Sequence, residues 1–332
     1  MTIRVSIIIP SAGRRPELLK RAIKSALIDD IKIQTEIIVV LNGQNGLAFD
    51  TRNCIQHTLV KYYKIEDGNV SKARNYGLSL VQGELVRFLD DDDYLYPDVA
   101  YQQYLELYQS DAELSTYSVA VEDDNTRYQV LEPIDVEDYC VATLSENFVG
   151  LPLISIYKYK IIKYLKWDEE ISIVEDEKWM RTISANAEIK WIKSNNVVAV
   201  WYQHDMDRLS VSASYVHPEL FKNRQQSIQE TLQKLIANNR MTPLRLRAAS
   251  GGLWSCIHGG FYFSPVFWTD VALYVRKLDP QSKPNDPFFH KLPNWIHPLM
   301  IEWLMLPKRW LNHVVRKLKI NFGYNKSYVR KF

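Results

Sequence analysis

Four consecutive aspartates at positions 90–93 are the residues of this sequence that best suit chemistry. They follow the apolar run 85–89, which only Arg87 interrupts, and such a run is typical of a buried central strand. Carboxylates packed this closely repel one another, so a cation must compensate them. Their oxygens suit Mg²⁺ or Mn²⁺, which keep open positions for substrate phosphates. The run therefore predicts a metal site at a strand end, and the alternative is a solvated acidic turn.

Arg74 is the next side chain that suits a phosphorylated ligand. It lies in a helix that we expect to begin with Ser71 as its N-cap and to end at Gly83. A cation beside a helix N-terminus is able to hold a diphosphate. The alternative is that Arg74 pairs with the acidic run and supports the fold, and the two roles are compatible.

The elements that position these residues are short apolar strands alternating with helices. Near-continuous β-branched runs predict buried parallel strands at 5–10, 36–41 and 60–65. Apolar residues at helical spacing predict helices at 18–27, at 97–110 and from 175 onward. Further strands are expected at 114–121, 127–131, 188–193 and 196–201, the first two as a hairpin. Successive strand–helix units indicate a doubly wound α/β sheet.

Four motifs in this order resemble family 2 glycosyltransferases, which have the GT-A fold. The family's first strand ends Pro-Thr-x-Asn and its second ends Asp-Asp-Gly-Ser, and the corresponding stretches here are Pro10-Ser11-Ala12-Gly13 and Leu41-Asn42-Gly43-Gln44. Residues 68–78 closely match Gly-x-Ser-x-Ala-Arg-Asn-x-Gly-Leu, and residues 89–93 resemble the family's Leu-Asp-x-Asp-Asp (the DxD motif). The resemblance implies a Rossmann-like, mostly parallel sheet flanked by helices over residues 1–215. Residues 216–332 are expected to form an α-helical extension.

The resemblance also implies a nucleotide-sugar donor bound across the strand ends. Donor contacts are expected at Pro10, Ser11, Ala12, Gly13, Arg15, Asn42, Gly68, Arg74, Asp90 and Asp91. Asp92, with help from Asp90, is expected to hold Mg²⁺ or Mn²⁺ on the diphosphate. His204 is a third candidate ligand because related enzymes often carry a histidine here, although a lone histidine is more often structural. Asn42 replaces the aspartate with which the family touches the nucleotide base, so the base stays open.

Glu175 and Asp176 are the candidates for the catalytic base. Acidic residues that open a helix are often partners of its dipole. In the family, however, a Glu-Asp pair before such a helix supplies the base that deprotonates the acceptor hydroxyl, and Trp179 and Arg181 continue that pattern. We therefore expect Asp176 to be the base, with Glu175 as second choice, in an inverting transfer.

The composition excludes some partners and compartments. The 332 residues carry a net charge of only +2, so no nucleic-acid partner is expected. The three cysteines, Cys54, Cys140 and Cys256, are far apart in the sequence, which suits a reducing cytoplasm. Met1 runs almost directly into the first strand, so no signal peptide is expected.

The C-terminal region combines an apolar stripe with a basic surface. Trp310, Leu311, Val314, Val315 and Leu318 form the stripe, and no acidic residue follows Glu302. The basic residues are Lys308, Arg309, Arg316, Lys317, Lys319, Lys326, Arg330 and Lys331. Such a segment predicts contact with an anionic membrane surface; the alternative is a helix packed on the catalytic domain. By resemblance, we expect a peripheral protein at the inner face of the cell membrane that acts on a glycan or lipid-linked acceptor in bacterial surface polysaccharide synthesis (capsule, O-antigen or lipooligosaccharide).

Two other functions remain open at this point. A sugar nucleotidyltransferase also uses a Rossmann-like sheet and a metal, but its Gly-x-Gly-Thr-Arg loop is only faintly echoed by Ser11-Ala12-Gly13-Arg14. A catalytically inactive GT-A binding protein would explain Asn42 and the departures at positions 11–13. Release of free nucleoside diphosphate distinguishes the three.

Overall fold

The computed structural model describes residues 2–123, 126–204, 218–293 and 295–321, and the chain divides into two compact units, Met1–Met241 and Thr242–Phe332. The boundary expected from the sequence, at residue 215, lies outside the described residues. The difference is α9 (Pro218–Ala237), which packs on α7 (Glu175–Asn186) within the first unit.

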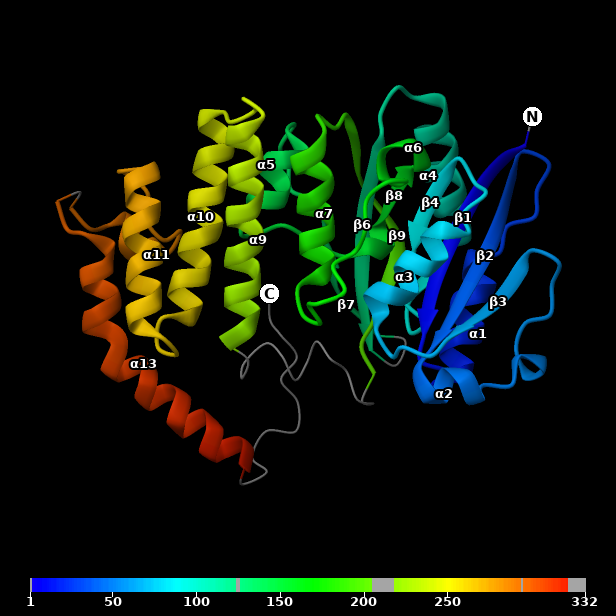
Figure 1. Ribbon diagram of the computed structural model, residues 1–332, viewed down its shortest axis with the longest axis horizontal. Coiled ribbons are helices and arrows are strands. Elements are labelled where there is room, and N and C mark those ends of the chain that lie inside the picture. The colour runs from blue at the N-terminus through cyan, green and yellow to red at the C-terminus, as the bar shows by residue number, and fades with distance from the viewer. Residues whose placement is uncertain (1, 124–125, 205–217, 294, 322–332) are drawn as a thin grey trace. The chain divides into compact units, whose positions relative to one another are not determined.

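Nine of the described strands form one mixed sheet in the first unit, in the order β3-β2-β1-β4-β8-β6-β9-β5, with β7 paired to β6 (Figure 1). The first four in sequence, β1 (Ile3–Ser11), β2 (Ile33–Asn42), β3 (Val60–Ile65) and β4 (Leu85–Phe88), are parallel. Ile8 of β1 lies opposite Phe88 of β4. This register carries the chain onward to Ser11 and Asp91 at the same edge of the sheet, where parallel strands end.

The other strands all lie beyond β4 in the sheet and include both parallel and antiparallel pairs. They are β5 (Tyr94–Leu95), β6 (Leu114–Asp123), β7 (Thr126–Leu131), β8 (Ser155–Lys158) and β9 (Trp191–Tyr202). β8 is antiparallel to β4 and to β6, whereas β9 is parallel to β6. The prediction of two strands at 188–193 and 196–201 is wrong: β9 is continuous, because shifts of register around Ser118 let one strand follow β6.

Helices cover both faces of this sheet, so the predicted α/β class is confirmed. They are α1 (Pro16–Ala26), α3 (Val70–Ser79), α4 (Pro97–Gln109) and α7, and α9 packs outside α7. The short helices are α2 (Gly43–Ala48), η1 (Thr51–Asn53), α5 (Tyr139–Leu144), η2 (Pro152–Ile154) and α6 (Tyr159–Ile162). The expected caps of α3 are wrong. Asn69 is its N-cap, since its side chain accepts from the Lys72 amide. Gly83 lies beyond the helix, where a Cβ would come within 2.7 Å of the Ser6 amide nitrogen.

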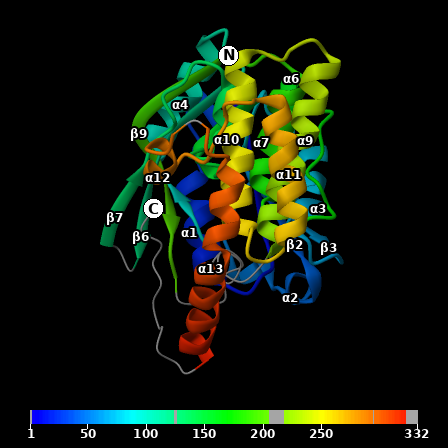
Figure 2. The same cartoon turned by 90° about the vertical axis from the view of Figure 1, so that its left-hand side faces the viewer.

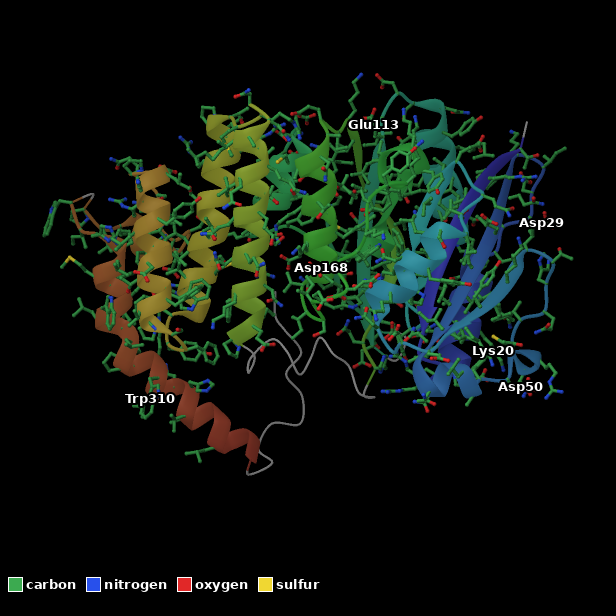
Figure 3. All side chains as sticks on the ribbon, viewed as in Figure 1. Lys20, Asp29, Asp50, Glu113, Asp168 and Trp310 are labelled. Carbon is green, nitrogen blue, oxygen red and sulfur yellow. The ribbon has the colours of Figure 1, made fainter. Side chains whose placement is uncertain are left out.

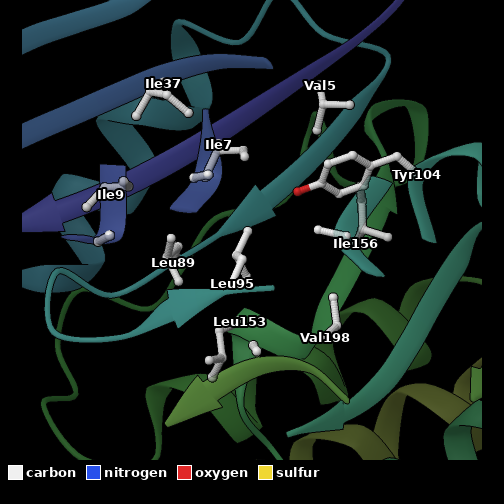
Figure 4. Close-up of a cluster of buried hydrophobic side chains, with 14 of the residues drawn as sticks. Val5, Ile7, Ile9, Ile37, Leu89, Leu95, Tyr104, Leu153, Ile156 and Val198 are labelled. Atoms are coloured by element: carbon white, nitrogen blue, oxygen red, sulfur yellow. The ribbon is translucent and has the colours of Figure 1, made fainter. Parts of the chain in front are cut away.

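Each face of the sheet carries its own apolar core. Ile7 and Ile9 point to the face covered by α1 and α4, shown in Figure 4 with Leu95 and Tyr104, whereas Ile8 points to the face covered by α3 and α7. Fully burying such a side chain stabilises the fold by about 1.5–3 kcal/mol. The strands are therefore apolar on both faces because both are covered.

The second unit is helical in its described part. It contains α10 (Pro243–Gly260), α11 (Pro265–Leu278), α12 (Pro287–His290) and α13 (Pro298–Asn321), visible in Figure 2. Gly260 lets Trp268 lie against the end of α10, because a Cβ there would collide with the indole ring. Glu302 of α13 is fully buried and pairs with Arg309 and with His258, whose Nδ1 lies 2.9 Å from its carboxylate. Among the described helices, none has the length and apolarity needed to cross a membrane.

Candidate active site

The ends of β1 and β4 bring Ser11 against Asp91. The Ser11 hydroxyl donates to Asp91 Oδ2 at 2.5 Å and accepts from the Gly13 amide at 3.1 Å. Gly13 has φ +70°, in the left-handed region that favours glycine, and a Cβ there would lie 3.1 Å from the Asn45 carbonyl oxygen. Asp91 is only 4% exposed, and burial raises its pKa to about 6.

Arg15, from the turn before α1, joins three of the predicted site residues. Its Nη2 donates to Asp91 Oδ1 and its Nη1 to Asp92 Oδ2, both at 2.7 Å, and Nη1 also contacts His204 Nε2. His204 Nε2 itself lies 2.9 Å from Asp92 Oδ2. The last acid of the run, Asp93, accepts instead from the Tyr202 amide at 2.9 Å and fastens the run to β9.

Arg21 is a site residue that sequence reasoning missed. Its guanidinium donates to the Asp92 carbonyl at 2.6 Å and lies between the rings of Tyr94 and Tyr202, at 4.4 and 4.1 Å from their centroids. The sequence carries no signal for this role, because Arg21 looks like any other cation on the polar side of α1.

Arg74 connects the acidic run to the start of α7. Its Nη2 donates to Asp90 at 2.8 Å and its Nη1 to Asp176 at 2.7 Å, and Glu175 lies 3.7 Å from Nη1. The guanidinium packs over Trp167 at 4.3 Å and is almost fully buried. Burial alone would lower the pKa of Arg74, but the three carboxylates raise it. The structural partner role is thus present, and the predicted donor contact remains a proposal.

The three acids that open α7 have different surroundings. Val174, just before them, has φ +74°, an uncommon conformation for a β-branched residue that costs about 1–3 kcal/mol. Burial raises the pKa values of Glu175 and, more strongly, of Asp176, although Arg74 opposes the shift. Burial also acts on Glu177, but the guanidiniums of Arg224 and Arg181 outweigh it and lower the pKa to about 2. Lys178 of α7 pairs with Asp168, labelled in Figure 3, which precedes the helix; the Nζ–Oδ2 distance is 2.8 Å.

The remaining predicted donor contacts lie along the ends of β1 and β2. Pro10 is paired with Val40, and Asn42, 7% exposed, ends β2 opposite Ile65. Gly68 lies against Gly43, where a Cβ on Gly43 would approach its Cα to 3.1 Å. Among the contacts of the described residues, none joins Asn42, Gly68 or Ala12 to the acidic run.

The three candidate metal ligands are only partly assembled. Asp92 and His204 are neighbours, whereas Asp90 faces Arg74 with its side chain 38% exposed. Within the described ranges, no group of three or more His, Cys, Asp or Glu side chains is gathered around one point. The chemistry still fits, because carboxylate oxygens and imidazole nitrogen bind Mn²⁺ and Mg²⁺ favours carboxylates. The buried Nδ1 of His204 has no hydrogen-bond partner among the described residues.

Solved structures confirm the GT-A fold. This chain is similar to S. aureus TarS 1-349 in complex with UDP, at a TM-score of 0.60 and 16% identity over 99% of this chain and 93% of the other. For the complex of the same protein with UDP-GlcNAc, the TM-score is 0.53 at 15% identity over the same shares. At such identities the likeness establishes the fold alone.

Sequence comparisons identify the family. An uncharacterized glycosyltransferase of Rickettsia conorii is 37% identical over 95 residues, which are 28% of this chain and only 15% of that relative's length. The O-antigen biosynthesis glycosyltransferase WbnJ of Escherichia coli is 22% identical over 227 residues, covering 65% of this chain and 87% of WbnJ. The sequence model of Glycosyl transferase family 2 matches residues 6–178, more than half of the chain. The chain therefore belongs to glycosyl transferase family 2, a family of transferases, as its motifs predicted.

Proposed function

We propose that this protein transfers a sugar from a nucleotide-sugar to a hydroxyl of a glycan or lipid-linked acceptor, with inversion at the anomeric carbon. The main support for the proposal is that Arg74 donates both to Asp90 at the end of β4 and to Asp176 at the start of α7. One guanidinium thus ties the donor side of the site to the candidate base. The UDP and UDP-GlcNAc bound to TarS support a nucleotide-sugar donor.

Asp176 is the proposed general base. The acceptor oxygen attacks the anomeric carbon, its proton passes to Asp176, and the bond from that carbon to the diphosphate oxygen breaks. The raised pKa of Asp176 suits this task, because a carboxylate of higher pKa binds the transferred proton more strongly. Glu175 is the second choice, being buried beside the same guanidinium. Arg74 opposes the negative charge that grows on the leaving diphosphate.

A divalent cation completes the proposal. Asp92 and Asp90, with His204, would hold Mg²⁺ or Mn²⁺, and the ion when bound would neutralise diphosphate charge. The ends of β1 and β2, from Pro10 to Arg15 and at Asn42 and Gly68, would receive the nucleotide. Which base is bound stays open at Asn42.

The setting that we propose is bacterial surface polysaccharide synthesis at the inner face of the cell membrane, with residues 1–215 as the catalytic domain. The O-antigen relative supports the polysaccharide class. For the membrane, the supporting feature is α13, where Trp310 is 59% exposed and stands out from the helix in Figure 3, and Leu311 is 58% exposed. Arg309, expected on the basic surface, pairs with Glu302 instead. Residues 322–332, with three of the predicted basic side chains, lie outside the described residues.

Liposome sedimentation tests the membrane contact. The double variant W310S/L311S should bind vesicles containing anionic lipid less well than the wild type, and salt should release the wild type because it screens the lysines and arginines. L244S is the matched control, since Leu244 is 65% exposed on another helix of the same unit. Equal binding by W310S/L311S and the wild type would remove α13 from the membrane proposal.

Nucleoside diphosphate release tests the transfer itself. The full chain is incubated with UDP- and GDP-sugars, Mn²⁺ and oligosaccharide or lipid-linked acceptors, and free nucleoside diphosphate is measured. We expect release that depends on acceptor and is lost in D176N. Release of pyrophosphate from a nucleoside triphosphate would instead indicate a nucleotidyltransferase, and donor binding without any release would indicate an inactive binding protein.

A further inference from the structure

Arg15 contacts Asp92 and His204, two of the side chains proposed above to hold the cation. Its Nη1 donates to Asp92 Oδ2 at 2.7 Å and contacts His204 Nε2, and Oδ2 and Nε2 are themselves 2.9 Å apart. Its Nη2 is held by Asp91 Oδ1 at 2.7 Å. A single side chain therefore bridges two acids of the run and the histidine.

The Arg15 guanidinium occupies space that a cation bound by both Asp92 and His204 would use. Mg²⁺ and Mn²⁺ bind oxygen and nitrogen at about 2.0–2.2 Å, so an ion that bound Asp92 Oδ2 and His204 Nε2 from the side of Arg15 would overlap Nη1, which lies 2.7 Å from Oδ2. The guanidinium also carries a positive charge that repels the ion. Arg15 is 22% exposed and belongs to the turn between β1 and α1, so it is able to turn away without opening the apolar core.

We propose that Arg15 is an internal counter-cation, which holds the cation position between Asp92 and His204 and yields it when a nucleoside diphosphate binds. This inference rests on the proposed function. A diphosphate offers Arg15 the partner that it needs to leave, because guanidinium binds phosphate oxygens in the same two-pronged way as carboxylates.

The consequence is coupling between the two ligands. The cation binds weakly while Arg15 remains on Asp92 and tightly once the diphosphate has drawn Arg15 away. By linkage, the cation strengthens nucleoside diphosphate binding by the same factor. Arg15 would thereby make the protein bind a cation together with its donor rather than alone.

The test measures Mn²⁺ binding rather than transfer. Free Mn²⁺ is titrated by electron paramagnetic resonance in the wild type, R15A and R14A, without nucleotide and then with UDP or GDP, whichever protects the wild type against heat. R14A is the matched control, because Arg14 is exposed in the same turn and carries the same charge. Without nucleotide, R15A should bind Mn²⁺ about tenfold or more tighter than the wild type, since a charge in direct contact is removed. R14A should change by less than about threefold, because solvent and salt screen an exposed charge.

With nucleotide present, the three proteins should differ in how much their Mn²⁺ affinity increases. The nucleoside diphosphate should tighten Mn²⁺ binding strongly in the wild type and R14A, and much less in R15A. If R15A binds Mn²⁺ no tighter than R14A, or if the nucleotide tightens binding equally in all three, the inference is overturned. R15Q, which keeps hydrogen-bond donors without the charge, replaces R15A if circular dichroism shows that R15A is unfolded, and it should change Mn²⁺ affinity in the same direction. Transfer by the wild type in EDTA would show that the proposed function needs no divalent cation. The Mn²⁺ affinities of R15A and R14A would still test whether Arg15 holds the cation position.

Discussion

Asp91 in the acid run after β4 and Glu177 in the acid run that opens α7 differ in how many guanidiniums serve them. Arg15 is shared between Asp91 and Asp92, and it does not offset the burial that raises the pKa of Asp91 to about 6. Glu177 of α7 has two arginines of its own, and its pKa falls to about 2. Burial raises the pKa of both acids, and two guanidiniums are enough to bring that of Glu177 below its ordinary value, whereas one shared guanidinium is not enough for Asp91.

In each run the last acid holds the fold together rather than facing the candidate site. Asp93 is 2% exposed and accepts from the backbone of Tyr202, and Glu177 is clamped by Arg181 and Arg224. The acids before them face the shared guanidiniums of Arg15 and Arg74. Substitutions within one run should therefore separate loss of turnover from loss of stability.

The largest expected effect is that of D176N on turnover. Removing a general base typically costs about 10²–10⁴-fold in rate with little effect on ground-state binding. The variant should keep its fold and its affinity for the nucleoside diphosphate, measured by thermal stabilisation, while kcat falls. E175Q is the paired control. If E175Q is the inactive variant and D176N turns over normally, the two roles must be exchanged.

E177Q should instead lose stability. The substitution leaves Arg181 and Arg224 without their counter-charge in a largely buried place, which should cost about 2–4 kcal/mol in the free energy of unfolding. Urea unfolding measures it, with E66Q, a change at an exposed glutamate, as control.

The stability of the wild type should also depend on pH through Glu177. The folded pKa of about 2 lies below the ordinary value of 4.5, so this contribution is complete above pH 4.5 and is lost as the pH falls toward 2. E177Q should lack that part of the acid dependence. An unchanged acid profile would show that Glu177 is not the paired acid.

The pH dependence of kcat should report the burial of Asp176, which raises its pKa although Arg74 opposes the shift. Because Asp176 acts when ionised and its folded pKa is raised, kcat should increase about tenfold per pH unit up to that pKa. The midpoint should lie well above 3.8, the ordinary value for aspartate. A midpoint near 3.8 would mean that the base is a solvated carboxylate elsewhere.

The smallest expected effect is that of S11A. Loss of the hydroxyl that donates to Asp91 at 2.5 Å should cost about 1–2 kcal/mol of stability, because Asp91 is buried. Urea unfolding measures it, with S79A on α3 as control. No change in S11A would show that Arg15 alone satisfies Asp91.

The sequence by itself determined the local features of this protein. The apolar runs of β1 to β4 and the helical spacing of Trp179, Met180 and Ile183 were enough to predict the strands and α7, because burial on both faces or on one stripe leaves a periodic mark. The order of the motifs also predicted the family and the acids of the candidate site.

Only the tertiary structure decided the partners of those residues. Arg15 and Arg74 meet acids 77 and 102 positions away, and Arg21 reaches the Asp92 carbonyl across 71 positions. Even Arg87 of β4 is buried, and its guanidinium donates to the Gln103 side chain and to the Leu153 carbonyl. Such pairings depend on the register of strands and the packing of helices rather than on neighbouring residues, so local periodicity carries no record of them. The same holds for α9, whose place in the first unit follows from its packing on α7.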